Sequence, residues 1–144
     1  MQHIALFFNV FACVMLTLAF PLPSSSTIHE DELVDIEKRI DHVGRGTWFR
    51  PGLGNCGKWN NASDLIVAIG KRLYDRNKGS NCDQYMEIIN TANGKKAYGL
   101  TRDSCHSCSD DDIDMSPALF KKLAPLEQGV IRVSWHFKNR SWRP

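Results

Sequence analysis

The stretch LTRDSCHSCSDDDIDMSPALF, residues 100–120, decides how this chain folds. We expect a strand to end at Asp103, a short loop bounded by two cysteines to follow, and the chain to return through residues 112–117 into a helix. Ser116 and Pro117 suit the cap and the first position of that helix. Asp103 and Asp114 would then lie on either side of one small loop, where a fold can place two acids in a surface groove.

The first 43 residues are expected to lie outside the folded domain. Residues 4–20 form an apolar run that is short for a membrane span, so we predict a signal peptide at 1–19 rather than a retained anchor. Residues 20–43 are rich in serine and then in acidic residues, and Lys38-Arg39 supplies a dibasic cleavage site. This pattern favours an acidic propeptide or linker; the alternative is an amphipathic helix, because Leu33, Ile36 and Ile40 have helical spacing.

Residues 44–144 have the length of one small domain. Two of the 18 Lys and Arg residues and six of the 16 Asp and Glu residues precede Gly44, so this domain carries a net charge of about +6. A basic extracellular domain suits acidic partners such as anionic wall polymers or phospholipid surfaces, unless the charge serves solubility alone. No run of Lys and Arg is long enough to predict nucleic-acid binding.

Four cysteines remain once Cys13 is removed with the leader, and an even number in a secreted chain predicts two disulfides. We favour Cys56–Cys82 with Cys105–Cys108, although the sequence leaves the three pairings open. The motif Cys105-His-Ser-Cys108 also suggests zinc or redox chemistry, but no second ligand pair has zinc spacing, so we expect no metal and no cofactor. The sequons that start at Asn61 and Asn139 predict N-glycosylation.

Short strands dominate the expected secondary structure. They are predicted at 47–49, 64–69, 85–89, 96–100 and 129–137, with one helix at 116–124. Asn93-Gly94, between two of these strands, is a strong hairpin signal. Many short strands with one short helix predict a small all-β, closed barrel, because closure removes the exposed strand edges.

Six motifs in order carry a resemblance to a known family. They are Gly46-Thr47-Trp48-Phe49, GLGNCG at 52–57, SDLIVA at 63–68, Asn81-Cys82, RDSCHSC at 102–108 and DIDMSP at 112–117. With the final Val-x-Trp-x-Phe strand at 133–137, the chain resembles the double-psi β-barrel domains of barwin, expansin and rare-lipoprotein-A-like proteins, especially small secreted fungal members. The resemblance implies a six-stranded double-psi β-barrel with one or two short helices over residues 44–144.

The resemblance implies several activities, since these barrels include expansins, family-45 endoglucanases, lytic transglycosylases, chitin-binding barwins and cysteine-protease inhibitors. It implies a groove in which Asp114 matches the acid of expansins and endoglucanases, and Asp103 matches the acid that ends the preceding strand. Hydrolysis would need Asp114 as general acid and a separate base. The first strand, TWFRP at 47–51, has no acid, and no histidine follows the apolar strand as it does in transglycosylases.

We therefore predict binding of wall polysaccharide without efficient hydrolysis, and keep a weak endoglucanase or lytic transglycosylase that uses Asp114 and Asp103 as an alternative. In the binding hypothesis these two acids line the groove. Trp48 and Phe49 stack on sugar rings, while basic side chains, Arg50 and Lys58, hold acidic polymer.

Structural roles are the competing interpretation of several of these residues. Asp103 could accept backbone N–H groups of the loop, and Arg102 beside it is expected to keep it ionised and to pair with it. Asp114 could favour the N-terminus of the following helix. Trp135 is predicted to be core, and the acidic run at 110–112 a solvated loop, because it lacks the spacing of a calcium loop.

The expected partner is cellulose, chitin, glucan or peptidoglycan, bound by a secreted monomer in the extracellular space or cell wall. The alternative partner is a cysteine protease, inhibited through exposed loops at 52–61 or 105–112, or an effector target met in the same way. Nucleic acid is not an expected partner, nor is a membrane once the leader is removed.

Overall fold

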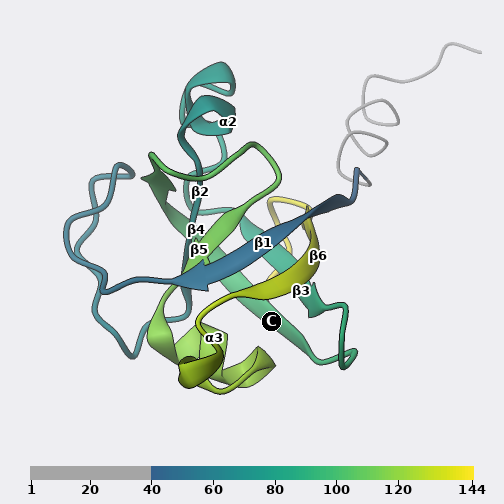
Figure 1. Ribbon diagram of the computed structural model, residues 1–144. Coiled ribbons are helices and arrows are strands. Elements are labelled where there is room, and N and C mark those ends of the chain that lie inside the picture. Colours follow the sequence, from purple (N-terminus) through teal and green to yellow (C-terminus); the bar gives the residue numbers. More distant parts are fainter. Residues whose placement is uncertain (1–39) are drawn as a thin grey trace, which may run out of the picture.

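The computed structural model describes residues 40–144, so the predicted signal peptide and Lys38-Arg39 lie outside the described residues. Its strands are β1 (His42–Trp48), β2 (Ile66–Gly70), β3 (Tyr85–Asn90), β4 (Lys96–Cys105), β5 (Ile113–Met115) and β6 (Ile131–Phe137). They close into a barrel in the order β1-β5-β2-β4-β3-β6 (Figure 1). The α-helices of this region are the short α2 (Lys71–Arg76) and α3 (Pro117–Leu123), and a 3-10 turn follows at Leu126–Gln128. The expected all-β, six-stranded barrel with two short helices is confirmed.

Parallel pairing gives this barrel its crossed connections. β1 pairs parallel with β5, and β2 pairs parallel with β4, whereas the remaining neighbours are antiparallel. Parallel strands cannot be joined by a tight hairpin, so long segments must cross between them. Residues 49–65 connect β1 to β2, which lie on either side of β5, and project to the left in Figure 1.

Alternate residues of the strands fill the barrel with apolar side chains. The fully buried side chains include Val67, Ile69, Met86, Ile88, Ile113, Met115, Val133 and Trp135, together with Leu119, Phe120 and Leu123 of α3. Trp135 is core, as expected, and its Nε1 donates to the backbone oxygen of Asp111 at 2.7 Å. Within residues 40–144, no helix is long and apolar enough to span a bilayer.

Several elements differ from the sequence-based expectation. β1 starts at His42, before the expected 47–49, and β4 runs to Cys105, two residues past Asp103, where we expected the strand to end. α2 and the three-residue β5 were not expected as regular elements. Gly44 explains part of this, because a Cβ there would lie 2.2 Å from the backbone oxygen of Asp111. A glycine that weakens the strand signal is what lets the loop before β5 approach β1.

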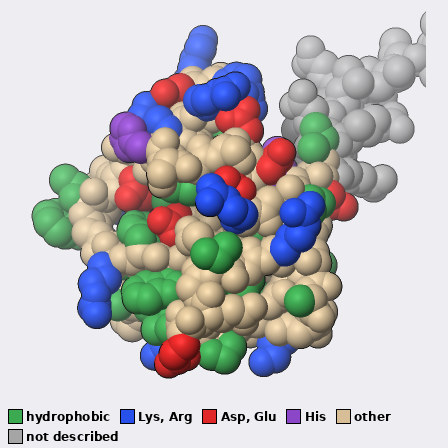
Figure 2. Space-filling view, viewed as in Figure 1, with side chains coloured by type: hydrophobic (Ala, Val, Ile, Leu, Met, Phe, Trp, Pro, Cys, Tyr) green, Lys and Arg blue, Asp and Glu red, His purple; other side chains and the backbone are tan. Residues whose placement is uncertain are grey.

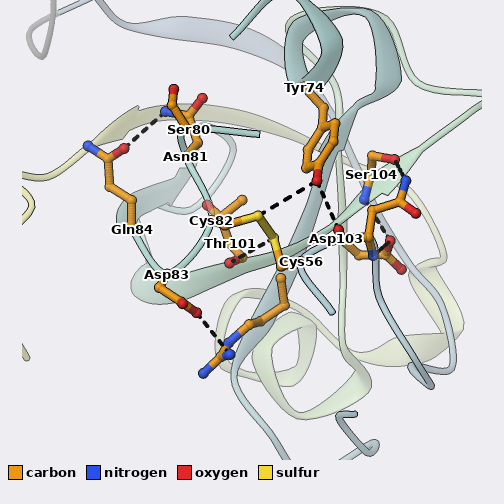
Figure 3. The surroundings of a disulfide bond; sticks show 12 residues. Cys56, Tyr74, Ser80, Asn81, Cys82, Asp83, Gln84, Thr101, Asp103 and Ser104 are labelled. Atoms are coloured by element: carbon orange, nitrogen blue, oxygen red, sulfur yellow. Dashed lines mark hydrogen bonds and ion pairs between the residues drawn. A yellow bond between two sulfur atoms is a disulfide. The ribbon is translucent and has the colours of Figure 1, made fainter. Parts of the chain in front are cut away.

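The two disulfides join Cys56 to Cys82 and Cys105 to Cys108, which is the pairing that we favoured. The first fastens the 49–65 segment to the chain between α2 and β3 (Figure 3). The second closes a short loop after β4. Two disulfides in so small a domain fit an oxidising, extracellular compartment.

Candidate functional site

Four residues on four neighbouring strands form what we call the acid row: Thr47 of β1, Asp114 of β5, Ala68 of β2 and Asp103 of β4. Thr47 pairs with Asp114, and Ala68 pairs with both acids. Partner residues on adjacent strands present their side chains on the same face of a sheet. The two acids thus flank the small, buried Ala68, with Cα atoms about 10 Å apart, two strand spacings.

Asp114 is the acid of the row whose pKa is shifted by burial. Its side chain is half-buried, and its Oδ1 accepts a hydrogen bond from Thr47 Oγ1 at 2.8 Å. Burial raises the pKa of Asp114, and the charge of nearby Asp103 raises it further, while the Thr47 hydroxyl acts in the opposite direction. Asp114 therefore holds a proton to higher pH than an ordinary aspartate.

Asp103 anchors a loop. Its Oδ1 accepts the backbone N–H groups of Asn55 at 2.9 Å and Ser104 at 2.8 Å. This is the structural role that the sequence analysis set beside catalysis. The expected pairing of Arg102 with Asp103 is wrong: Arg102 binds Asp83 instead, with an N–O distance of 2.8 Å (Figure 3). The register of β2 and β4 shifts beside Ala68, and such a bulge re-aims neighbouring side chains.

The predicted sugar-stacking residues at the end of β1 are only partly available. Trp48 packs against the core, and its Nε1 donates to the backbone oxygen of Leu126 at 3.1 Å. Phe49 is half-buried, and its N–H binds the backbone oxygen of Met115. Arg50 and Lys58 are both exposed, so the basic side chains reach solvent.

The segment 50–61, here called the Trp59 loop, carries two residues that the sequence analysis missed. Trp59 is 78% exposed and Leu53 is 59% exposed, and the two pair across an antiparallel bridge. Their side chains therefore lie side by side. The sequence did contain a sign that Trp59 is exposed: it stands between the polar residues Lys58 and Asn60, and no core strand is expected there.

The base of the Trp59 loop is fastened at several points. Asn55 binds Asp103 through its N–H and Ser104 through its amide, and Tyr74 of α2 donates to the Asn55 oxygen at 2.9 Å. The N–H of Cys56 binds the oxygen of Arg102, and the Cys56–Cys82 disulfide lies beside these contacts (Figure 3). In Figure 2 a hollow separates a projecting group of hydrophobic side chains at the left from the body of the barrel, and acidic side chains border it.

The acidic run before β5 is not the solvated loop that we expected. Asp112 is 7% exposed and accepts from the backbone N–H of Arg45 at 2.7 Å, from the Arg45 guanidinium at 2.9 Å and from Ser109 N–H at 3.1 Å. Burial acts to raise the pKa of Asp112, but the hydrogen bonds from Arg45 and Ser109 outweigh it and hold the pKa well below its usual range. Asp110 pairs with Arg76 of α2 at 2.7 Å.

Two further features bear on ligands. Among residues 40–144, no group of three or more His, Cys, Asp and Glu side chains is placed to hold a metal ion, and the sulfurs of Cys105 and Cys108 are bonded to each other. A cavity of about 460 Å³ lies on the outer face of β3 and β4, lined in part by Tyr85, Tyr98 and Arg102. That cavity does not include either acid of the row.

Comparison with known proteins shows which family this barrel belongs to. The chain is 34% identical over 101 residues to a papain inhibitor of Streptomyces mobaraensis, covering 66% of this chain and 70% of that protein. The solved structure of Streptomyces papain inhibitor matches with a TM-score of 0.62 and 32% identity, covering 70% of this chain and 96% of that one. The chain belongs to the barwin/expansin-like double-psi β-barrel family.

The chain is also similar to expansins. It is 38% identical over 88 residues to Expansin-like protein 3 of Dictyostelium discoideum, covering 54% of this chain and 25% of that protein. A Clavibacter michiganensis expansin solved in complex with cellohexaose has the same fold, with a TM-score of 0.63 and 21% identity over 73% of this chain and 54% of that one. This barwin/expansin-like chain thus spans about a quarter of the first protein and about half of the second. No protein-family model matches it.

Proposed function

We propose that this protein is secreted as a monomer and binds cell-wall polysaccharide at the acid row without efficient hydrolysis. The observation that carries the proposal is the half-buried Asp114, held by Thr47 in a row that also contains Asp103. A protonated or ionised carboxyl at the surface of a barrel can hydrogen-bond sugar hydroxyls. The similarity to Expansin-like protein 3 supports the same class of ligand.

Binding is favoured over hydrolysis because only one acid of the row, Asp114, is suited to catalysis, whereas Asp103 holds a loop. Asp114 suits a general acid, since burial raises its pKa. An inverting hydrolase also needs a carboxylate base that can activate water. The Oδ1 of Asp103 is committed to two backbone N–H groups that hold the Trp59 loop. The end of β1 and the residues after it, TWFRP, supply no other acid.

The neighbouring residues have supporting roles in this proposal. The uncovered part of Trp48 and the ring of Phe49 stack on sugar rings beside the acid row. Arg50 and Lys58, both exposed, attract polymers that carry acidic groups.

Glycosylation is proposed at Asn61 and Asn139. Both are exposed, and the Oδ1 of each accepts a hydrogen bond from the serine hydroxyl of its own sequon, at 2.6 Å for Ser63 and 3.2 Å for Ser141. Mass spectrometry of protein secreted from a eukaryotic host, before and after glycosidase treatment, tests both sites.

A pull-down with product analysis tests the polysaccharide proposal. Wild type is incubated with cellulose, chitin, β-glucan and peptidoglycan, and both retention and soluble reducing ends are measured. We expect retention on at least one polymer without soluble products, weaker retention for Asp114→Asn, and unchanged retention for Asp75→Asn, an exposed acid of α2. Retention on none of the polymers, or reducing-end release that Asp114→Asn abolishes, contradicts the proposal.

A second candidate function is inhibition of a papain-like cysteine protease. It is supported by 34% identity to a papain inhibitor over 70% of that protein's length. The exposed Leu53 and Trp59 provide a protein-docking surface outside the acid row. If this function holds, the protein inhibits papain, and Asp114→Asn inhibits as strongly as wild type.

A further inference from the structure

The Trp59 loop presents an unusual apolar surface for a small secreted domain. Trp59, at 78%, is the most exposed large apolar side chain of residues 40–144, and Leu53, at 59%, lies beside it across the bridge. The other exposed apolar side chains, such as Val130 before β6, belong to other segments. Adjacent exposed apolar side chains of this size mark an interaction surface.

The charge of the loop indicates what kind of surface it meets. Its charged residues are Arg50 and Lys58, both exposed, and it contains no acid. A partner should therefore offer an apolar pocket with an acidic rim, because complementary charge favours correct docking and suppresses other partners. A neutral or uniformly basic surface does not fit this description.

The loop is also held in place before any partner arrives. Asp103, Ser104 and Tyr74 bind Asn55, and the Cys56–Cys82 disulfide lies next to it (Figure 3). A preorganised loop loses little conformational entropy when it binds. Rigid support below an exposed tryptophan is the arrangement expected of a binding anchor.

The alternative loop at 105–112 is also held in place, but it lacks the exposed apolar side chains and the basic charge of the Trp59 loop. Its acids face the scaffold, where Asp112 binds Arg45, Asp110 binds Arg76 and Asp111 binds His42. Its exposed residues include the polar His106 and Ser107. This loop is built to hold β1 and α2, and it offers a partner little apolar area.

We infer that the Trp59 loop is the surface through which this protein inhibits a cysteine protease, and that Trp59 enters the cleft of the protease as anchor with Leu53 beside it. The protease that fits this loop has an apolar cleft with acidic groups at its rim. This inference rests on the second candidate function and assigns it a surface. Asp103 is then a positioning residue, because it acts on the partner through the loop that it holds.

Inhibition of papain by four variants tests the inference. Trp59→Ala and Leu53→Ala remove the anchor and its neighbour, Val130→Ala removes an exposed apolar side chain elsewhere, and His106→Ala alters the other loop. We expect Trp59→Ala to raise the inhibition constant at least ~30-fold, as for a binding hot spot. Leu53→Ala should raise it less, and the two controls should stay within about twofold, because surface changes outside an anchor are near neutral. Thermal unfolding of each variant shows that the fold is intact.

The outcomes separate the inference from the function on which it rests. If wild type inhibits papain and Trp59→Ala inhibits equally well, the inference is wrong and the function stands. If wild type inhibits no papain-like protease, the candidate function and the inference both fall. If Trp59→Ala keeps inhibition but loses retention on cellulose or chitin, the loop is a sugar platform and the inference is again wrong.

Discussion

Replacing Asp112 should destabilise the barrel more than any other change in the acidic run. Its carboxylate accepts from the backbone N–H of Arg45 through Oδ1, and from the Arg45 guanidinium and Ser109 N–H through Oδ2. These contacts tie the end of the 105–112 loop to β1, next to Gly44, where the two segments come closest. Asp112→Ala removes both oxygens that accept these hydrogen bonds.

The size of the effect follows from the groups left behind. Asp112→Ala leaves the backbone N–H groups of Arg45 and Ser109 without their acceptor, and because both hydrogen bonds are only part-buried each loss should cost about 1–1.5 kcal/mol. The lost ion pair adds little, because the Arg45 side chain is 62% exposed, so we expect a total loss of about 2–4 kcal/mol in the free energy of unfolding. Asp112→Asn keeps one acceptor oxygen and should lose about 1.5–3 kcal/mol, the range for hydrogen bonds to a charged group.

The pH dependence gives a sharper test than the magnitude. The pKa of Asp112 is held below its usual range, so its ionised form stabilises the folded state. That stabilisation is fully present above the pKa of an unfolded aspartate, about 3.9, and is lost as the pH falls through the lower folded-state pKa. The gap between wild type and Asp112→Asn should be constant from about pH 5 to 8 and shrink below about pH 4.

Urea unfolding followed by tryptophan fluorescence at pH 7 and at low pH measures both quantities. Asp111→Asn is the matched control, because the Asp111 side chain is exposed and an asparagine oxygen there can still accept from His42 Nδ1; it should change stability by less than about 0.5 kcal/mol. A loss below about 1 kcal/mol for Asp112→Ala would show that the backbone N–H groups left unpaired do not cost the stability that we assign to them. If the difference in free energy of unfolding between wild type and Asp112→Asn is the same at pH 7 and at the lowest accessible pH, the predicted dependence on Asp112 ionisation is wrong.

Three further predictions concern stability. Replacing the cysteines of the Cys56–Cys82 bridge by serine should cost about 3.5 kcal/mol, against about 2 kcal/mol for Cys105–Cys108, because the sequence separations are 26 and 3; denaturant titration compares them. Burial raises the pKa of Asp114, so its ionisation opposes folding and stability should fall as the pH rises above the usual aspartate pKa. Asp114→Asn should remove that fall and be the more stable form at pH 7 but not at pH 3, which melting curves at both pH values will show. Gly99→Ala should cost about 1–3 kcal/mol and lower Tm, because its Cβ would lie 2.4 Å from Val67 Cγ2 and 2.6 Å from Leu119 Cδ2.

Local patterns in the sequence predicted the elements whose signals are local. The Asn93-Gly94 turn joins β3 and β4 as an antiparallel hairpin, with Gly94 at a φ of 71°. Ser116 caps α3, with Pro117 at its first position. Turn and cap residues act on their immediate neighbours, so a single sequence reveals them.

Weak or interrupted patterns hid other elements. β5 has three residues with an acid at its centre, and β1 contains Gly44 and Gly46. Their strand conformation comes from pairing: β1 pairs with β5 and β6, and β5 also pairs with β2. Tertiary pairing thus overrides low strand propensity. The structural role of Asp112, which binds β1 through Arg45, was not predicted either, because Arg45 is 67 residues away in the sequence.

The sequence alone predicted a closed barrel, two disulfides and two acids near one loop, since cysteine count, strand pattern and motif order are properties of the chain itself. The structure decided which of the three possible disulfide pairings forms. Tertiary structure decided that Asp103 holds the Trp59 loop, that Asp114 is half-buried beside Thr47, and that Trp59 faces solvent while Trp135 fills the core. Alternation along a strand tells which residues share a face, but neighbours across the barrel are set by closure of strands that lie far apart in sequence.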